Sequence, residues 1–207
     1  MSANQIALVR RGLQLSYATL AYNGLEGIIA ILAGLAAGSI ALVGFGADSL
    51  IEVTASLTAI WRLRSDSDPV LRERSERISL RIIGTLFLAL AAYVAADAIQ
   101  SLITRQAPDA SPVGLILAAA SLVVMPLLAN AKRRVAVAMG SGALAAESRQ
   151  TMLCTYLSAI LLGGLMLNAV LGWWWADPVA ALVMVPIIVR EGIEALRGRT
   201  ACGECCP

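Results

Sequence analysis

Residues 38–64 read GSIALVGFGADSLIEVTASLTAIWRLR, an apolar segment with two carboxylates near its centre. The part from 40 to 61 is long enough to cross a bilayer as one helix, which takes about 20 apolar residues. Asp48 and Glu52 are four positions apart, so a helix places both side chains on one face. The next basic residue is Arg62, too far along the chain to pair with them. Because uncompensated charges are costly inside a membrane, the pair predicts a site for a cation or for protons.

The whole chain has the composition of an integral membrane protein. Of its 207 residues, 58% are hydrophobic and 14% are charged, and the mean hydropathy is +0.77. Soluble domains carry about 25% charged residues, so this chain is unusually apolar. The apolar blocks predict an all-α, polytopic membrane protein with six transmembrane helices, at about 15–37, 40–61, 78–103, 113–128, 144–171 and 178–189. No cleavable signal peptide is expected, because the first residues are too mixed in polarity.

The basic residues predict the orientation of the spans. With six spans, one side of the membrane receives Arg10, Arg11, Arg62, Arg64, Arg72, Arg74, Arg77, Arg81, Lys132, Arg133, Arg134, Arg197 and Arg199. The loops on the other side carry Arg105 alone. Because cytoplasmic loops are enriched in lysine and arginine, both termini are expected on the cytoplasmic side of the cell (inner) membrane. The net charge of +2 reflects this asymmetry and does not indicate nucleic-acid binding.

Two polar segments interrupt or follow the apolar blocks. Residues 64–77 contain Pro69 and alternating charges, and they predict a cytoplasmic connector. The membrane domain is expected to cover residues 1–196, followed by a short cytoplasmic tail, residues 197–207, which reads RGRTACGECCP.

The tail is rich in cysteine, and the chain has no histidine. Cytoplasmic thiols stay reduced, so a disulfide framework is not expected. Clustered thiols bind soft metal ions, and the tail is predicted to capture metal through Cys202, Cys205 and Cys206. The alternative is a disordered tail in which the cysteines are incidental.

Other polar residues within the predicted spans could share the cation site. Asn23 and Glu26 are three positions apart in the first span. In the fifth span, Glu147, Gln150 and Cys154 follow the i, i+3, i+7 spacing of one helix face. Polar groups at membrane depth usually face a protein interior or an ion path.

Each of these residues also has a simpler interpretation. Glu26 and Asp97 could be hydrogen-bonded structural residues, and the thiol in the fifth span could be an ordinary core residue. Glu147 could pair with Arg134 or Arg149 near the cytoplasmic surface. Arg149 could be structural, could reach toward the cytoplasm, or could act as a tethered cation that competes with metal at the two carboxylates.

Three stretches resemble the transmembrane domain of the cation diffusion facilitator family. Residues 38–64 resemble its second span, SGALAAESRQTMLCTYLSAILLGG (141–164) its fifth, and GWWWADPVAALVMVPIIVREGIEAL (172–196) its last. The likeness extends from about 23 to 196. It implies a transporter and not an enzyme, from a short branch that lacks the family's cytoplasmic carboxy-terminal domain.

The resemblance also implies a metal site, with departures from the family pattern. The Asp-x-x-x-Asp of the family reads Asp48-x-x-x-Glu52 here, and its His-x-x-x-Asp reads Gln150-x-x-x-Cys154. The implied ligands are therefore these four residues. A glutamine is a weaker ligand than an imidazole, so two neighbours could substitute for it, and two polar residues of the first span are further candidates; these are Glu147, Thr151, Asn23 and Glu26.

The implied activity is export of a divalent metal ion, as substrate, in exchange for protons. Metal ligands must be deprotonated to bind, so the exchanged protons would ride on Asp48, Glu52 or Cys154. A thiolate favours zinc first, or cadmium, whereas an all-oxygen site would favour manganese, iron or cobalt. The resemblance also implies a homodimer within the lipid bilayer. Two alternatives are a non-transporting metal or redox sensor that acts through the cysteine tail and a proton-coupled permease for small solutes.

Overall fold

The regular structure of the protein is helical throughout the part that the structure describes. The computed structural model describes residues 3–64, 69–106 and 108–197. They form six helices, α1 (Ala3–Ala37), α2 (Ile40–Arg64), α3 (Pro69–Thr104), α4 (Pro112–Met139), α5 (Gly142–Leu171) and α6 (Ala176–Leu196). The all-α prediction is confirmed. Five of these helices, all but α6, are long and apolar enough to cross a membrane; α6 carries charged residues near both of its ends.

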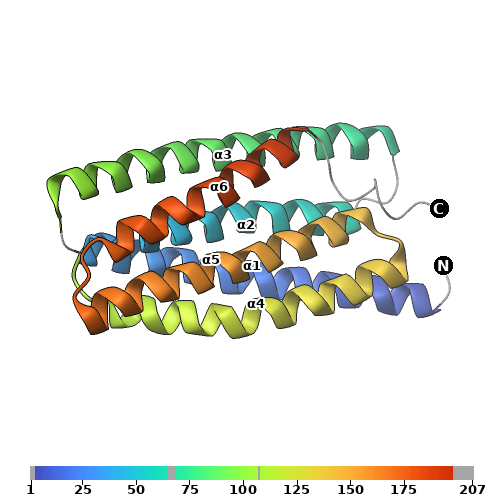
Figure 1. Cartoon of the computed structure of the whole chain (residues 1–207). Coiled ribbons are helices and arrows are strands. Elements are labelled where there is room, and N and C mark those ends of the chain that lie inside the picture. Colours follow the sequence, from blue (N-terminus) through green and yellow to red (C-terminus); the bar gives the residue numbers. More distant parts are fainter. Residues whose placement is uncertain (1–2, 65–68, 107, 198–207) are drawn as a thin grey trace.

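The helices associate in three pairs. The most extensive contacts join α1 to α2, α4 to α5, and α3 to α6. Figure 1 shows α3 and α6 lying side by side along one flank of the bundle, although they are far apart in the sequence. Helix α2 contacts α1, α3, α5 and α6, so it occupies the centre of the bundle. The start of α1 and the end of α6 lie at the same end, which we call the termini end (Figure 1).

A buried carboxylate fixes the opposite end of α2. Asp177, at the start of α6, accepts hydrogen bonds from the backbone N–H of Ile40 at 2.9 Å and from the hydroxyl of Ser39. The first backbone N–H groups of a helix have no partner within it and form its positive end, so an acidic side chain stabilises them. This contact ties α6 to α2 just after the turn at Gly38, whose φ is +65°. It thereby fixes the depth of the helix that carries Asp48 and Glu52.

Close helix contacts depend on glycine. A Cβ added to Gly46 would lie 2.9 Å from the carbonyl oxygen of Gly27 and 2.9 Å from the backbone nitrogen of Ile31. Both atoms belong to the backbone of α1, so they can move away only if the helix moves. The glycine pair therefore sets the spacing between α1 and α2 directly beside Asp48.

Gly46→Ala is expected to lower the free energy of unfolding by about 1–3 kcal/mol, because an extra carbon in a packed contact forces the two helices apart. The measurement is thermal unfolding of the purified protein in detergent. The matched control is Gly24→Ala on α1, where an added Cβ meets nothing within 4 Å. That control should be neutral or slightly stabilising, because alanine favours helix over glycine. Equal stability of the two variants would contradict the close-contact argument.

Three predicted boundaries were wrong. The first span was expected to begin at residue 15, but α1 begins at Ala3 and its apolar segment at Ile6. Residues 69–77 were expected in a connector, but α3 begins at Pro69. Proline suits the first position of a helix, because its missing N–H would have no partner there. The fourth span was expected to end at residue 128, but α4, which contains Pro126, continues to Met139 through the basic run that begins at Lys132. The prediction from composition ended the span before the charged residues, whereas the helix continues through them.

Candidate metal centre

The two carboxylates of α2 are buried near the middle of that helix. Asp48 is 6% exposed and Glu52 is 1% exposed. Both side-chain oxygens of Glu52 are buried and accept no hydrogen bond from any described residue. Burying an unpaired carboxylate costs free energy, and a cation or a proton bound at Glu52 would reduce this cost.

Helix α1 contributes an unpaired amide to the same region. Asn23 is fully buried, and neither its Oδ1 nor its Nδ2 has a hydrogen-bond partner in the described part of the chain. The Asn23 and Thr151 side chains are the polar neighbours of the Glu52 carboxylate, although neither meets hydrogen-bond geometry with it. Unpaired oxygen atoms from α1 and α2 therefore lie together in the bundle.

The thiol of Cys154 lies in the same region. It is 1% exposed, and the three carboxylates that act on it electrostatically are those of Glu26, Asp48 and Glu52. Cys154 therefore lies within electrostatic range of Asp48 and Glu52. Within residues 3–64, 69–106 and 108–197, however, no three histidine, cysteine, aspartate or glutamate side chains are close enough to hold a metal ion. Side chains would have to move inward to coordinate one.

Glu26 is bound to hydroxyl groups of two neighbouring helices. Its Oε2 accepts a hydrogen bond from Ser49 of α2 at 3.0 Å, and its Oε1 accepts one from Ser121 of α4 at 2.6 Å. These contacts agree with the structural interpretation of Glu26. They also hold a third carboxylate beside the metal-site candidates at a fixed position.

Gln150 lies one helical turn before Cys154 on α5, at the edge of the helix that borders a cavity. It lines this cavity, of about 660 Å³, between α3, α5 and α6, and its buried Nε2 has no hydrogen-bond partner among the described residues. Arg149 is exposed and lines the same cavity, where Glu191 of α6 is its acidic neighbour. Glu191 also acts electrostatically on Asp48. Asp97, half-buried on α3, lies against Tyr93 of the same helix.

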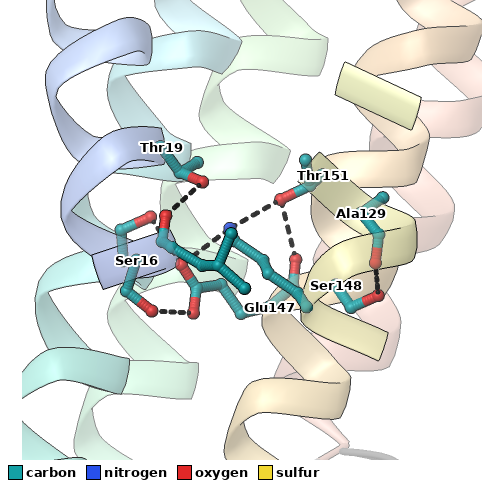
Figure 2. Close-up of polar contacts among 9 residues, drawn as sticks. Ser16, Thr19, Ala129, Glu147, Ser148 and Thr151 are labelled. Atoms are coloured by element: carbon teal, nitrogen blue, oxygen red, sulfur yellow. Dashed lines mark hydrogen bonds and ion pairs between the residues drawn. The ribbon is translucent and has the colours of Figure 1, made fainter. Parts of the chain in front are cut away.

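A buried ion pair occupies the helix junction next to Glu52. Figure 2 shows Glu147 of α5 at the centre of this polar cluster. Its Oε1 accepts hydrogen bonds from Lys132 at 2.8 Å and from Ser56 at 3.0 Å, and its Oε2 accepts one from Ser16 at 2.7 Å. The Lys132 ammonium also donates to Thr151 Oγ1 at 3.0 Å. Four helices thus meet through hydrogen bonds to one carboxylate and one ammonium.

This cluster corrects one interpretation and one prediction. The alternative interpretation of Glu147 paired it with Arg134 or Arg149, but its partner is Lys132. Lys132 was expected in a cytoplasmic loop, but its side chain is fully buried. The ammonium of a lysine can sit inside a bundle when an anion and hydroxyl oxygens surround it, as they do here.

Comparison with known proteins agrees with a transmembrane domain. A model described as the cation efflux transmembrane domain matches residues 16–199. The chain is also 25% identical, over 166 residues, to a protein of Synechocystis sp. named "Uncharacterized transporter sll1263". That alignment covers 77% of this chain and 54% of the relative, so the chain spans about half of the relative's length. The domain match covers most of the chain, which therefore belongs to the cation efflux family, the cation diffusion facilitators that its sequence resembles.

Proposed function

We propose that the protein exports a divalent metal ion of the zinc or cadmium type from the cytoplasm in exchange for protons. One observation carries the proposal. Glu52 is buried in the middle of a membrane span, one turn after Asp48 on the same helix face, and neither of its carboxylate oxygens has a hydrogen-bond partner among the described residues. Two buried carboxylates at that depth, one of them without hydrogen-bond partners among the described residues, are explained by a cation that binds there and leaves again.

The proposed ligands are Asp48, Glu52 and Cys154, with Asn23 as the fourth. Asn23 Oδ1 is buried and unpaired beside Glu52, which favours it over Gln150 on the cavity side of α5. Glu26 is a reserve ligand, because two hydroxyl groups already occupy its oxygens. The remaining candidates, Glu147 and Thr151, are bound to Lys132 and are less available.

Proton exchange follows from the same ligands. A carboxylate or thiol must lose its proton before it binds metal, so each binding event releases protons from the site. After the metal leaves, Asp48, Glu52 and Cys154 can take up protons from the opposite side. The site then alternates between a metal-loaded and a protonated form, which is the requirement for an antiporter.

The proposed topology has six spans in the inner membrane of the cell. Both termini lie in the cytoplasm. Helix α6 lies along α3 for much of its length, which supports its role as the sixth span despite its charged ends. Residues 1–196 would form the transport domain and residues 197–207 a metal-capturing tail, in a homodimer. The tail cysteines, Cys202, Cys205 and Cys206, lie outside the described residues.

The test is metal transport into proteoliposomes that contain a pH-sensitive dye. Wild-type protein is expected to move zinc and cadmium with opposing proton flow. Cys154→Ser should raise the KM for both ions by about tenfold or more and change the KM for manganese by less than about threefold, because a thiolate prefers softer ions. The control is a variant with serine at the three tail cysteines, tested with and without the Cys154 substitution.

Three outcomes are informative. Absence of flux for every divalent ion would exclude the exporter. Metal flux without proton movement would exclude exchange but keep metal transport. An equal change of KM for zinc and manganese in Cys154→Ser would remove the thiol from the site.

A further inference from the structure

A lysine is buried in the bundle next to the candidate metal centre. Lys132 has no exposed surface, and its Nζ lies 2.8 Å from Oε1 of Glu147. An ammonium at this depth is costly, and such groups are kept in membranes mainly where they serve an ion path or a coupled pair. The metal site proposed above does not use Lys132 as a ligand, because an ammonium has no lone pair to offer.

The contacts around Glu147 hold this ammonium in one place. Ser16 and Ser56 donate to the carboxylate from α1 and α2, and Thr151 accepts from Lys132 while donating to the Glu147 carbonyl at 3.0 Å. The anion therefore has three donors, and the ammonium has two oxygen acceptors. The pair is positioned by four helices and not by one flexible side chain.

The ion pair also faces Glu52. Ser56, which donates to Glu147, follows Glu52 by one helical turn on α2, so the pair lies about one turn from the unpaired carboxylate. Lys132 acts electrostatically on Glu52, more strongly than Glu147 does. The Lys132 ammonium is thus a positive charge near Glu52 that is held in place by the carboxylate of Glu147.

We propose that Lys132 is a resident counter-cation that weakens metal binding at Asp48 and Glu52 and so promotes release. The inference rests on the proposed function, because the metal is the ion that the ammonium repels. Without metal, the ammonium offsets part of the charge of Glu52. With a divalent cation on Glu52, two like charges face each other in a low-dielectric interior, where repulsion is strong. Glu147 holds the ammonium back and limits this competition.

The test of this role is zinc binding to the full-length protein in buffered-zinc solution. The binding that is lost in Glu52→Gln is the part that depends on the site. Lys132→Met is expected to tighten that binding by about tenfold or more, because the nearby repulsion is removed. Glu147→Gln is expected to weaken it by about tenfold, because the freed ammonium can then approach Glu52. The zinc affinity of the double variant should lie between those of the two single variants. Because the double variant leaves no charge of this pair unpaired, it also controls for misfolding caused by a lone buried charge.

The opposite signs of the two single variants separate this role from a structural one, which would weaken binding in both. Zinc transport adds a second signature: Lys132→Met should lower KM and kcat together, because tighter binding slows release. If Glu52→Gln loses zinc binding but Lys132→Met matches the wild type, the counter-cation role is wrong and the metal site stands. If Glu52→Gln binds zinc as the wild type does, the proposed site is wrong and the inference falls with it.

Discussion

Replacing Glu52 by glutamine is expected to reduce zinc transport, at zinc concentrations below KM, by at least about 100-fold. Unit charges 4 Å apart attract by about 4 kcal/mol at an effective dielectric constant of 20, and a divalent ion doubles this value. A loss of about 2.7 kcal/mol of interaction free energy, less than half of that doubled value, already corresponds to a change of about 100-fold in transport. Glutamine keeps the shape of the side chain and removes only its charge, so the change isolates the electrostatic contribution of Glu52.

The measurement is the initial rate of zinc uptake into proteoliposomes, normalised to the amount of folded protein. Asp48→Asn should change the rate in the same direction, because it removes the other charge of the pair. The control is Asp97→Asn, the same carboxylate-to-amide change at a half-buried position on α3 beside Tyr93. That variant should transport within about twofold of the wild type, since Asp97 is partly exposed and its charge is screened by solvent. Wild-type rates in Glu52→Gln would exclude this carboxylate from the transport path.

The parts of the site that could be predicted from sequence are those encoded by spacing within one helix. Asp48 and Glu52 are one turn apart in an unbroken apolar segment, and helical geometry alone places them on one face. Their burial at 6% and 1% exposed fits that expectation. Five of the six predicted spans correspond to helices long and apolar enough to cross a membrane, because length and hydropathy are local properties.

Spacing along α5 was a less reliable guide. Glu147, Gln150 and Cys154 were assigned to one stripe, but the fully buried positions of that helix include Thr151 and Ser158, with Gln150 on the cavity side. At 3.6 residues per turn, a position three residues on is rotated by about 60° from the starting side chain, whereas one seven residues on is rotated by only about 20°. Gln150 therefore lies about 40° around α5 from Cys154, and this smaller offset is enough for it to line the cavity with residues of α3 and α6.

Lys132 was missed because it is followed by two arginines. The three basic residues together are typical of a cytoplasmic loop, which is how Lys132 was interpreted. A different signal was present: Ser121, Met125, Ala129 and Lys132 continue the four-and-three spacing of the buried face of α4. Arg133 and Arg134 depart from that spacing and are exposed. Which acid meets Lys132 depends on how α4 and α5 pack, and no local pattern contains that information.

Glu147→Leu is expected to lower the free energy of unfolding by about 3–5 kcal/mol, the typical cost of leaving one partner of a buried ion pair alone. Of its two described acceptors, Lys132 would keep the hydroxyl of Thr151, and its side chain has no exposed surface. For a chain of this length, the loss corresponds to a decrease of about 10 °C in the thermal unfolding midpoint. Unfolding in detergent, followed by tryptophan fluorescence, measures it.

Two further variants show whether the unpaired charge is the cause. Lys132→Met combined with Glu147→Leu should recover most of the lost stability, because an apolar pair of similar volume replaces the ion pair without leaving a charge behind. Glu194→Leu breaks the exposed pair with Arg190, in which the two side chains are 39% and 78% exposed. It should change the midpoint by less than about 3 °C, because surface ion pairs contribute at most about 1 kcal/mol. If the double variant is no more stable than Glu147→Leu, the loss comes from the packing of the α4–α5 contact and not from the charge of Lys132.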